Sequence, residues 1–353
     1  MSSHAQTELM FTDRVNKILQ NMPSYVKTYI RATHNRTAPR TRYEYLKDIQ
    51  KFLDYIKEQT GHFPELSDLA ALNKESFEEY LEYLEHYDDN GTERTNSRAS
   101  LKRKLSSLRK LFGYLFENGM LPSDEIRKVE LPKLHRKEII RLEQNEAADL
   151  LSAAEHGKNL TEKETDYHNL QSIRDTALIS LLLSTGMRVS ECAELDVSDI
   201  DLDQCRARIV RKGGDESIVY FSDQAAEKLS NWLEQRKTKP GNDGPALFLS
   251  SRGGRMSVRT IQYLVKKYAS RSVPMKHITP HKLRATYATE LYNRTGDIYL
   301  VAEALGHRDV TTTKEHYAHL SEDRKMEARN VVSYGQGKDG PNACAQRPAP
   351  GPS

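Results

Sequence analysis

A break in apolar periodicity between Leu121 and Lys137 divides the chain into two parts and limits the folds open to it. This segment has two prolines, mixed charge and no sustained helical or alternating pattern, which is typical of a linker. A chain of 353 residues is long enough for two domains with separate cores. We therefore predict domains over residues 23–120 and 138–334, joined by a linker over 121–137. Residues 1–22 are interpreted as an N-terminal extension, and the Gly- and Pro-rich residues 335–353 as a disordered tail.

The first domain is predicted to be helical. Residues 41–56, 73–87 and 97–117 each place apolar side chains at intervals of three and four, the spacing of one helix face. Asn73 is a suitable N-cap for the second of these helices, and Asn118-Gly119 ends the third. The expected inward positions are Tyr45, Ile49, Phe52, Ile56, Phe77, Leu81, Leu84, Leu101, Leu105, Leu108, Leu111, Phe112 and Leu115.

The third of these helices is rich in basic residues. A net charge of +3 is too small to indicate a nucleic-acid partner by itself, but Lys and Arg are concentrated between Arg94 and Lys110. Lys102 and Arg109 share the face opposite the leucines, so their side chains are expected to point outward together. Such a face either is simply solvated or attracts the phosphates of a polyanion. The candidate DNA-binding residues are Arg98, Lys102, Arg103, Lys104 and Arg109.

The second domain is expected to be rich in helices, with one short β element. Ala207–Val210 and Ile218–Phe221 are β-prone segments on either side of Lys212-Gly213-Gly214-Asp215, which predicts a hairpin turn. A long polar insert lies between Ala154 and Arg174. We interpret it as a surface loop, or as a contact to DNA or to a partner subunit.

Two motifs in this domain place cationic side chains at helix ends. In Gly186-Met187-Arg188-Val189-Ser190-Glu191, an apolar helix ends at the glycine and Arg188 follows at the corner. A guanidinium held there is suited to a phosphate, although a surface or salt-bridge arginine is the commoner outcome. In Thr279-Pro280-His281-Lys282-Leu283-Arg284, Thr279 is the expected N-cap, and His281 and Arg284 are three residues apart on one face. They form either an anion site with a proton-transfer group or a chance surface pair.

A third motif contains a histidine and a tyrosine. The segment from Leu305-Gly306-His307 to Tyr317 predicts a helix that stops at the glycine, a histidine at the corner and a new helix that presents Tyr317. The chain has 18 tyrosines, and most are expected to be ordinary amphipathic core residues. The order and spacing of all three motifs is far more specific than any one of them.

Taken together, these residues resemble the tyrosine recombinase (phage integrase) family. The resemblance covers residues 140–330 and comprises the Gly-Met-Arg-Val-Ser-Glu box, the β-turn lysine, the His-x-x-Arg box, Leu-Gly-His and the tyrosine. In the first domain, Asn21–Val26 and Tyr43–Lys47 look like the Xer-type single recombinases of streptococci. The resemblance implies a mainly α fold with a small β-sheet, arranged as a two-domain C-shaped clamp. A helical core-binding domain would be followed by a mixed α/β catalytic domain.

The same resemblance implies a role for each motif residue. Tyr317 is the expected nucleophile, which forms a 3′-phosphotyrosyl bond and releases a 5′-hydroxyl. The other expected catalytic residues are Arg188 and Arg284, which hold the non-bridging phosphate oxygens; Lys212, which protonates the leaving 5′ oxygen; His281, a base or hydrogen-bond partner; and His307, which binds a phosphate oxygen. Glu191 is expected to orient the site. Because one phosphodiester replaces another, no metal, nucleotide or other cofactor is expected.

Two departures from the family pattern stand out. Ala285 occupies a position where many relatives have a second histidine. Tyr317 lies ten residues after His307, whereas nine is common in Xer proteins, and His316 occupies that nine-residue position. Neither departure removes a residue with an assigned role.

The resemblance leaves several functions open. The expected partners are double-stranded DNA with a specific recombination site and three further copies of the chain, which form a homotetramer on paired sites. The role is either chromosome dimer resolution or mobile-element or phage integration. The short stretch before Pro23 favours a Xer-type role or a simple integrase, because integrases often carry an additional arm-binding domain there. The motifs are also compatible with a type IB topoisomerase-like enzyme or with a catalytically inactive DNA-binding regulator.

The apolar segments are too short for a membrane span, and the three cysteines lack metal-ligand spacing, which favours a reduced cytoplasm.

Overall fold

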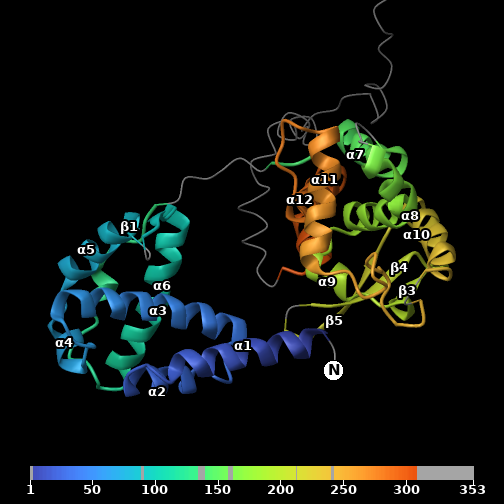
Figure 1. Cartoon of the computed structure of the whole chain (residues 1–353). Helices are drawn as coiled ribbons and strands as arrows, with labels where there is room; N and C mark the ends of the chain where they lie inside the picture. Colours follow the sequence, from blue (N-terminus) through green and yellow to red (C-terminus); the bar gives the residue numbers. More distant parts are fainter. Residues whose placement is uncertain are drawn as a thin grey trace, which may run out of the picture. The chain divides into compact units, whose positions relative to one another are not determined.

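The computed structural model describes residues 3–88, 91–133, 140–157, 162–211, 213–239 and 242–307. The chain divides into two compact units, Met1–Lys137 and Glu138–Ser353, each with its own core (Figure 1). The described elements are mostly helices, with two small antiparallel sheets. The prediction of a mainly α fold with a small β content is therefore confirmed.

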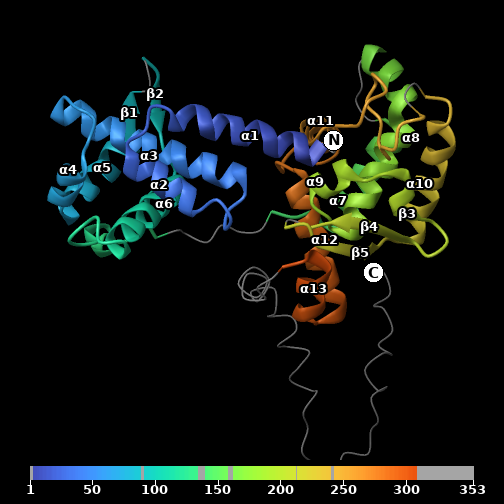
Figure 2. The ribbon, with the colours of Figure 1, turned by 90° about the horizontal axis from the view of Figure 1, so that it is seen from below.

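Unit 1 consists of helices and one short hairpin. The helices are α1 (Ser3–Leu19), α2 (Ser24–Ala32), α3 (Pro39–Thr60), α4 (Leu66–Ala71), α5 (Lys74–Glu85), α6 (Arg98–Glu117) and the 3-10 helix η1 (Glu125–Lys128). Strands β1 (His86–Asp88) and β2 (Glu93–Thr95) follow α5 and precede α6 in the chain, and they pair in antiparallel fashion (Figure 2).

The helices α3, α5 and α6 confirm the periodicity in the sequence. Their predicted apolar faces are buried, apart from Tyr45 and Leu81, which are half-buried. Asn73 caps α5 by accepting a hydrogen bond from the Ser76 amide at 2.9 Å. At the centre of the core, the ring of Phe77 stands edge-on to that of Phe112, with centroids 5.0 Å apart. Such aromatic pairs add to the stabilisation that comes from burial alone.

The first 22 residues differ from the extension that the sequence suggested. Of these, Ser3–Leu19 form α1, which lies along α3 (Figure 1). Val15 and Met22 are buried in the unit 1 core, and the ring of Phe11 packs against that of Tyr43 at 5.5 Å. Burial of these side chains makes α1 a part of unit 1.

A buried carboxylate joins α3 to α6. Asp48 is 2% exposed and accepts hydrogen bonds from Arg103 Nη2 at 2.9 Å and Ser107 Oγ at 2.8 Å. Lys104 Nζ lies 3.5 Å from the same carboxylate. Burial lowers the pKa of Lys104, and the attraction of Asp48 opposes this shift. Two of the basic residues of α6 are thus partners of an acid in the core.

We expect the Asp48→Ala substitution to lower the free energy of unfolding by about 2–3 kcal/mol, because two cations and a buried hydroxyl lose their acceptor. The loss stays moderate because Arg103 is 46% exposed and retains contact with water. Urea denaturation of the full chain measures it. Glu58→Ala, at an exposed position of the same helix, is the matched control and should change stability by less than about 0.5 kcal/mol. Equal effects of the two substitutions would contradict the prediction.

Unit 2 packs helices around a long central helix, α8. Its elements are α7 (Gln144–His156), α8 (Glu162–Thr185), α9 (Val189–Glu194), η2 (Val197–Asp199), β3 (Ile200–Asp201), β4 (Arg206–Val210), β5 (Glu216–Tyr220), α10 (Asp223–Arg236), α11 (Val258–Ser272), α12 (Pro280–Thr295) and α13 (Ile298–Leu305). α8 contacts α7, α10 and α12 (Figure 1). Its residues 177–182 are buried.

The polar insert is helical where the structure describes it. From Glu162 onward it forms the first turns of α8, so the surface-loop interpretation is wrong for this part. His168, within the insert, is buried, with Nδ1 3.2 Å from the hydroxyl of Tyr268. That hydroxyl donates to Asp175 Oδ2 at 2.9 Å, and Arg174 Nε donates to Asp175 Oδ1 at 2.9 Å. This buried polar network anchors the insert to α11, and burial lowers the pKa of His168.

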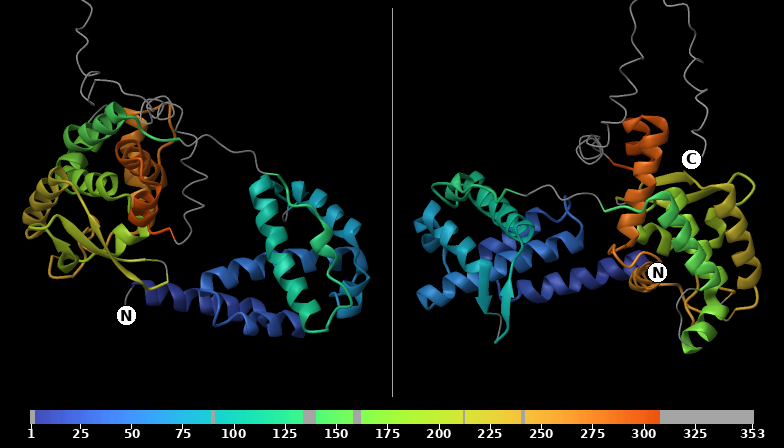
Figure 3. Two further views of the ribbon diagram at one scale, coloured as in Figure 1. Left: turned by 180° about the vertical axis from the view of Figure 1, so that it is seen from behind. Right: turned by 90° about the horizontal axis from the view of Figure 1, so that it is seen from above.

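The predicted hairpin is confirmed and extended by one strand. β4 lies between β3 and β5, with Ala207 opposite Val219 and Arg208 opposite Ile218 (Figure 3). Ala207 and Val219 face the core, whereas Arg208 and Ile218 face outward. Alternation of this kind fixes the register of the two strands.

Within the described residues, no helix is both long and apolar enough to cross a membrane.

Candidate active site

The end of α8 places Arg188. Gly186 has a left-handed φ of 60°, which ends the helix as the sequence predicted. The ring of Tyr287 packs directly on this glycine, and an added Cβ would lie 2.3 Å from its Cδ1. Gly186 is therefore required both for its conformation and for the approach of α12. Burial in this contact raises the pKa of Tyr287.

Glu191 holds Arg188 from one turn further on. Glu191 Oε1 accepts from Arg188 Nη1 at 2.8 Å, and Oε2 accepts from the Arg188 main-chain amide at 2.7 Å. The Glu191 side chain is 3% exposed, whereas Arg188 is 36% exposed. A buried carboxylate that grips both the main chain and the side chain fixes the direction of a partly exposed guanidinium.

Arg284 lies deeper than Arg188. It is buried on α12, where Nη1 donates to the Gly186 carbonyl at 2.8 Å and Nη2 donates to the Leu305 carbonyl at 2.5 Å. It thus joins the end of α8 to the end of α13. The Thr279 side chain makes no capping hydrogen bond, although it occupies the predicted N-cap position and Pro280 the first helical position.

Arg211 is a member of this cluster that sequence reasoning missed. It directly follows β4, and its Nη1 and Nη2 donate to the carbonyls of Leu305 and Ala304, each at 3.0 Å. Its Nη1 also lies 3.7 Å from Glu191 Oε2. Burial lowers the pKa of Arg211, while the charge of Glu191 acts in the opposite direction. The only local signal was its position beside Lys212 in a short β element.

The two predicted histidines occupy different environments. His281 is exposed on the first turn of α12, while its motif partner Arg284 is turned into the unit. His307 follows Gly306, which has a φ of 62°, and its main-chain amide donates to the Ala302 carbonyl at 2.9 Å. The predicted stop of α13 at Gly306 is confirmed. Lys212 and Tyr317 lie outside the described residues.

The cluster is suited to an anion. Arg188 and Arg211 both pair with the buried Glu191 carboxylate. Arg284 joins them through the carbonyls of Gly186, two residues before Arg188, and Leu305, which Arg211 also binds. The excess positive charge sits on a rigid frame of helix ends, which is how proteins stabilise the charge that develops on a transferred phosphate. Within the described part of the chain, no group of three or more His, Cys, Asp or Glu side chains has the arrangement to hold a metal ion.

The basic residues of α6 do not all face outward. Arg109, expected to point outward with Lys102, instead donates to the main-chain carbonyls of Val129 and Ile126. It therefore fastens η1 and the following residue, Val129, to α6. Arg103 and Lys104 interact with Asp48, and Arg98 is exposed at the start of the helix.

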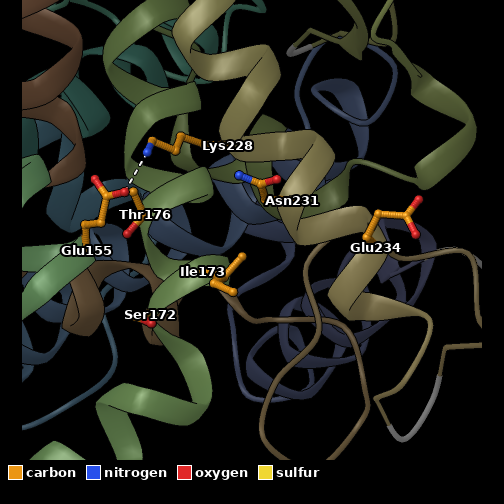
Figure 4. A pocket seen from close by; sticks show the side chains of 7 residues that line it. All are labelled: Glu155, Ser172, Ile173, Thr176, Lys228, Asn231 and Glu234. Atoms are coloured by element: carbon orange, nitrogen blue, oxygen red, sulfur yellow. Dashed lines mark hydrogen bonds and ion pairs between the residues drawn. The ribbon is translucent and has the colours of Figure 1, made fainter.

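A groove in unit 2 lies away from these arginines. It is formed by α7, α8 and α10, and its lining residues are Glu155, Ser172, Ile173, Thr176, Lys228, Asn231 and Glu234 (Figure 4). An ion pair of 2.6 Å between Lys228 and Glu155 crosses it. None of the predicted site residues lines it.

Comparison with known proteins identifies relatives along most of the chain. Residues 141–324 match the phage integrase family, and residues 25–119 match the N-terminal SAM-like domain of phage integrases. Tyrosine recombinase XerS of Streptococcus agalactiae is 32% identical over 90% of this chain and 98% of its own length. Tyrosine recombinase XerC of Corynebacterium glutamicum is 36% identical over 66% of this chain and 72% of its own length.

Solved structures share the fold. The XerH site-specific recombinase superposes with a TM-score of 0.63 at 21% identity, covering 92% of this chain and 89% of its own. A λ integrase fragment gives a TM-score of 0.59 at 19% identity, covering 83% of this chain and 94% of its own. Both units thus have the architecture expected from the motifs, a SAM-like core-binding domain followed by an integrase catalytic domain. The chain belongs to the phage integrase family and is a tyrosine recombinase of the Xer type, an enzyme that breaks and rejoins DNA strands.

Proposed function

We propose that this recombinase cuts DNA at a specific site through a 3′-phosphotyrosyl bond to Tyr317, and that it resolves chromosome dimers. The observation that carries the proposal is the gathering of two arginines at the end of α8, where Glu191 binds Arg188 and Arg284 binds the Gly186 carbonyl. These are the motif positions to which the family resemblance assigns the scissile phosphate. The family match covers Lys212 and Tyr317 as well.

The proposed cleavage is a transesterification. Tyr317 Oη attacks the scissile phosphorus, forming a phosphorus–oxygen bond to the tyrosine while the bond to the 5′ oxygen breaks. The phenolic proton passes to His281, because a phenol with an ordinary pKa of about 10 needs a base at neutral pH. Lys212 gives a proton to the 5′ oxygen, which leaves as a hydroxyl. Attack by a 5′-hydroxyl on the phosphotyrosine reverses these steps and reseals a strand.

The arginines stabilise the transition state in this proposal. Arg188 and Arg284 hold the non-bridging oxygens as negative charge develops on them, and His307 binds a phosphate oxygen. Glu191 orients Arg188, a role supported by the 2.8 Å contact between their side chains.

The proposed partner is double-stranded DNA, held by a homotetramer on two paired sites in the cytoplasm. In support, XerH has been solved bound to its difH substrate and λ integrase as a tetramer on a Holliday junction. On α6, we assign the DNA contacts to Arg98, Lys102 and Arg103, whose side chain is 46% exposed. Lys104 and Arg109 support the helix, because Lys104 lies beside Asp48 and Arg109 bonds to main-chain carbonyls.

A nicked duplex tests the proposal. The bound sequence is first mapped in the source genome, and a duplex of that site is nicked close to the scissile phosphate so that the released fragment diffuses away. A covalent complex should accumulate, and mass spectrometry of its peptides should find the nucleotide on Tyr317. Attachment at another residue, or no complex, would contradict the proposed mechanism. Relaxation of supercoiled plasmid that lacks the site would favour a topoisomerase-like enzyme.

The alternative role is integration of a mobile element or phage. The near full-length match to XerS favours dimer resolution. The mapped site distinguishes the two: a single site in the replication terminus supports resolution, whereas a site at the junction of a mobile element supports integration.

A further inference from the structure

Arg211 lies where three parts of unit 2 meet. It follows the last residue of β4, and its side chain is 90% buried, with an exposure of 10%. Its guanidinium bonds to the last two carbonyls of α13 and pairs with Glu191 at the start of α9. The hairpin is thus fastened by one side chain to two elements that are distant in the sequence.

These contacts are shared with the two catalytic arginines. The Leu305 carbonyl accepts from Arg211 Nη1 at 3.0 Å and from Arg284 Nη2 at 2.5 Å. The Glu191 carboxylate binds Arg188 through Oε1 and faces Arg211 through Oε2. Arg211 therefore connects the carboxylate that orients Arg188 to the carbonyl that receives Arg284.

Gly306, the residue before His307, lies directly against the Arg211 side chain. A Cβ on Gly306 would lie 2.7 Å from Arg211 Cζ and 2.8 Å from Nε. The guanidinium therefore packs against the bare Cα of Gly306, and a side chain there would displace it. The position of Arg211 thus also depends on the turn that carries His307.

We propose that Arg211 is a positioning residue that sets the β4–β5 turn, and with it the proton donor Lys212, against the helix ends that carry the catalytic arginines and His307. The inference rests on the proposed function, because it takes Lys212 as the donor to the 5′ oxygen. Arg211 is the direct chain neighbour of Lys212. Arg211 is held by the end of α13 and by the buried Glu191 carboxylate, so these contacts fix where the β4–β5 turn begins.

Stability alone is a weak reason for a buried arginine at this position. Removal of a guanidinium from water is costly, and an apolar side chain of similar size is often as stabilising or more so. A guanidinium, however, reaches two carbonyls and a carboxylate at once with fixed planar geometry, which neither a methionine nor the point charge of a lysine can do. That geometry is what the positioning of a neighbouring residue requires.

A substrate that needs no proton donor tests the inference. The nicked duplex of the mapped site is made with either oxygen or sulfur as the bridging 5′ atom of the scissile phosphate. Cleavage of the sulfur form breaks a phosphorus–sulfur bond and releases a thiolate, a good leaving group without protonation, since a thiol has a pKa of only about 8.5. We expect Arg211→Met to cleave the oxygen substrate about 10²–10³-fold more slowly than the wild type. It should cleave the sulfur substrate within about tenfold of the wild type.

Three further variants complete the experiment. Lys212→Met should show the same rescue by sulfur, and the double variant should be no slower than Lys212→Met alone, because two residues that act on one step are not additive. Arg208→Met, an exposed arginine on the same strand, should behave as the wild type on both substrates. Arg211→Lys keeps the charge, so it supplies the same oxygen-to-sulfur comparison if the methionine variant does not fold. Thermal unfolding of each variant is measured alongside.

The outcomes separate the two claims. If Lys212→Met is rescued by sulfur but the Arg211 variants are equally slow on both substrates, the inference is overturned and the role of Lys212 stands. If Lys212→Met is not rescued, the proton-donor assignment fails and the inference fails with it. Rescue of both, with wild-type behaviour of Arg208→Met, supports the positioning role.

Discussion

Substitution of Tyr317 by phenylalanine is expected to abolish the covalent protein–DNA complex and to change the dissociation constant for DNA by less than about threefold. The substitution removes a single oxygen, the atom that would attack phosphorus, and no other group in the proposed site can replace it in line with the leaving oxygen. Phenylalanine keeps the aromatic ring, so the change is confined to the hydroxyl. Denaturing gel analysis of the nicked duplex measures the complex, and a filter or gel-shift titration measures the affinity.

Tyr299→Phe is the matched control for this experiment. Tyr299 is 71% exposed on α13, and the same atom is removed from it. This variant should form the covalent complex at the wild-type rate. A residual complex with Tyr317→Phe would show that another nucleophile acts, with His316 at the nine-residue spacing the first position to examine. Loss of DNA affinity in step with the complex would show a folding or binding defect instead.

Features of the fold that depend on local pattern could be predicted from the sequence. Apolar spacing in α3, α5 and α6 gave the correct buried faces, because a helix that buries one side must repeat its apolar residues at that interval. The stops at Gly186 and Gly306 were equally local, since a left-handed φ favours glycine. Arg188 and Glu191 are also close in sequence, and they meet within one turn.

Features that depend on contacts between distant segments could not be predicted. Arg211 joins β4 to α13 across 94 residues, and nothing in its neighbourhood distinguishes it from an exposed strand arginine. The inward turn of Arg109 depends on the carbonyls of Ile126 and Val129, which lie 17 and 20 residues further along the chain, so the helical periodicity of α6 could not predict it. Similarly, α1 packs on α3, a separate segment of the chain, so the helical pattern of neither segment predicts the contact. The polar insert is held by the contact of His168 with Tyr268, which in turn donates to Asp175.

Arg284→Met is the second substitution with a large expected effect. Removal of a guanidinium from a phosphoryl-transfer site costs about 10³-fold or more in rate, because charge that develops in the transition state loses a fixed donor. Single-turnover cleavage of the nicked duplex should fall by at least this factor. Affinity for DNA should change by only a few-fold, since the interaction is strongest in the transition state.

Because Arg284 is buried, a loss of cleavage rate has to be distinguished from a loss of folded protein. Of the two carbonyls that Arg284 binds, that of Leu305 keeps its bond from Arg211, and that of Gly186 loses this donor. The expected cost is therefore about 1–2 kcal/mol in the free energy of unfolding, which leaves a typical domain folded. Arg294→Met, an exposed arginine of the same helix, should retain wild-type rate and stability. A rate loss below about tenfold for Arg284→Met, with the protein folded, would exclude this guanidinium from the transition state.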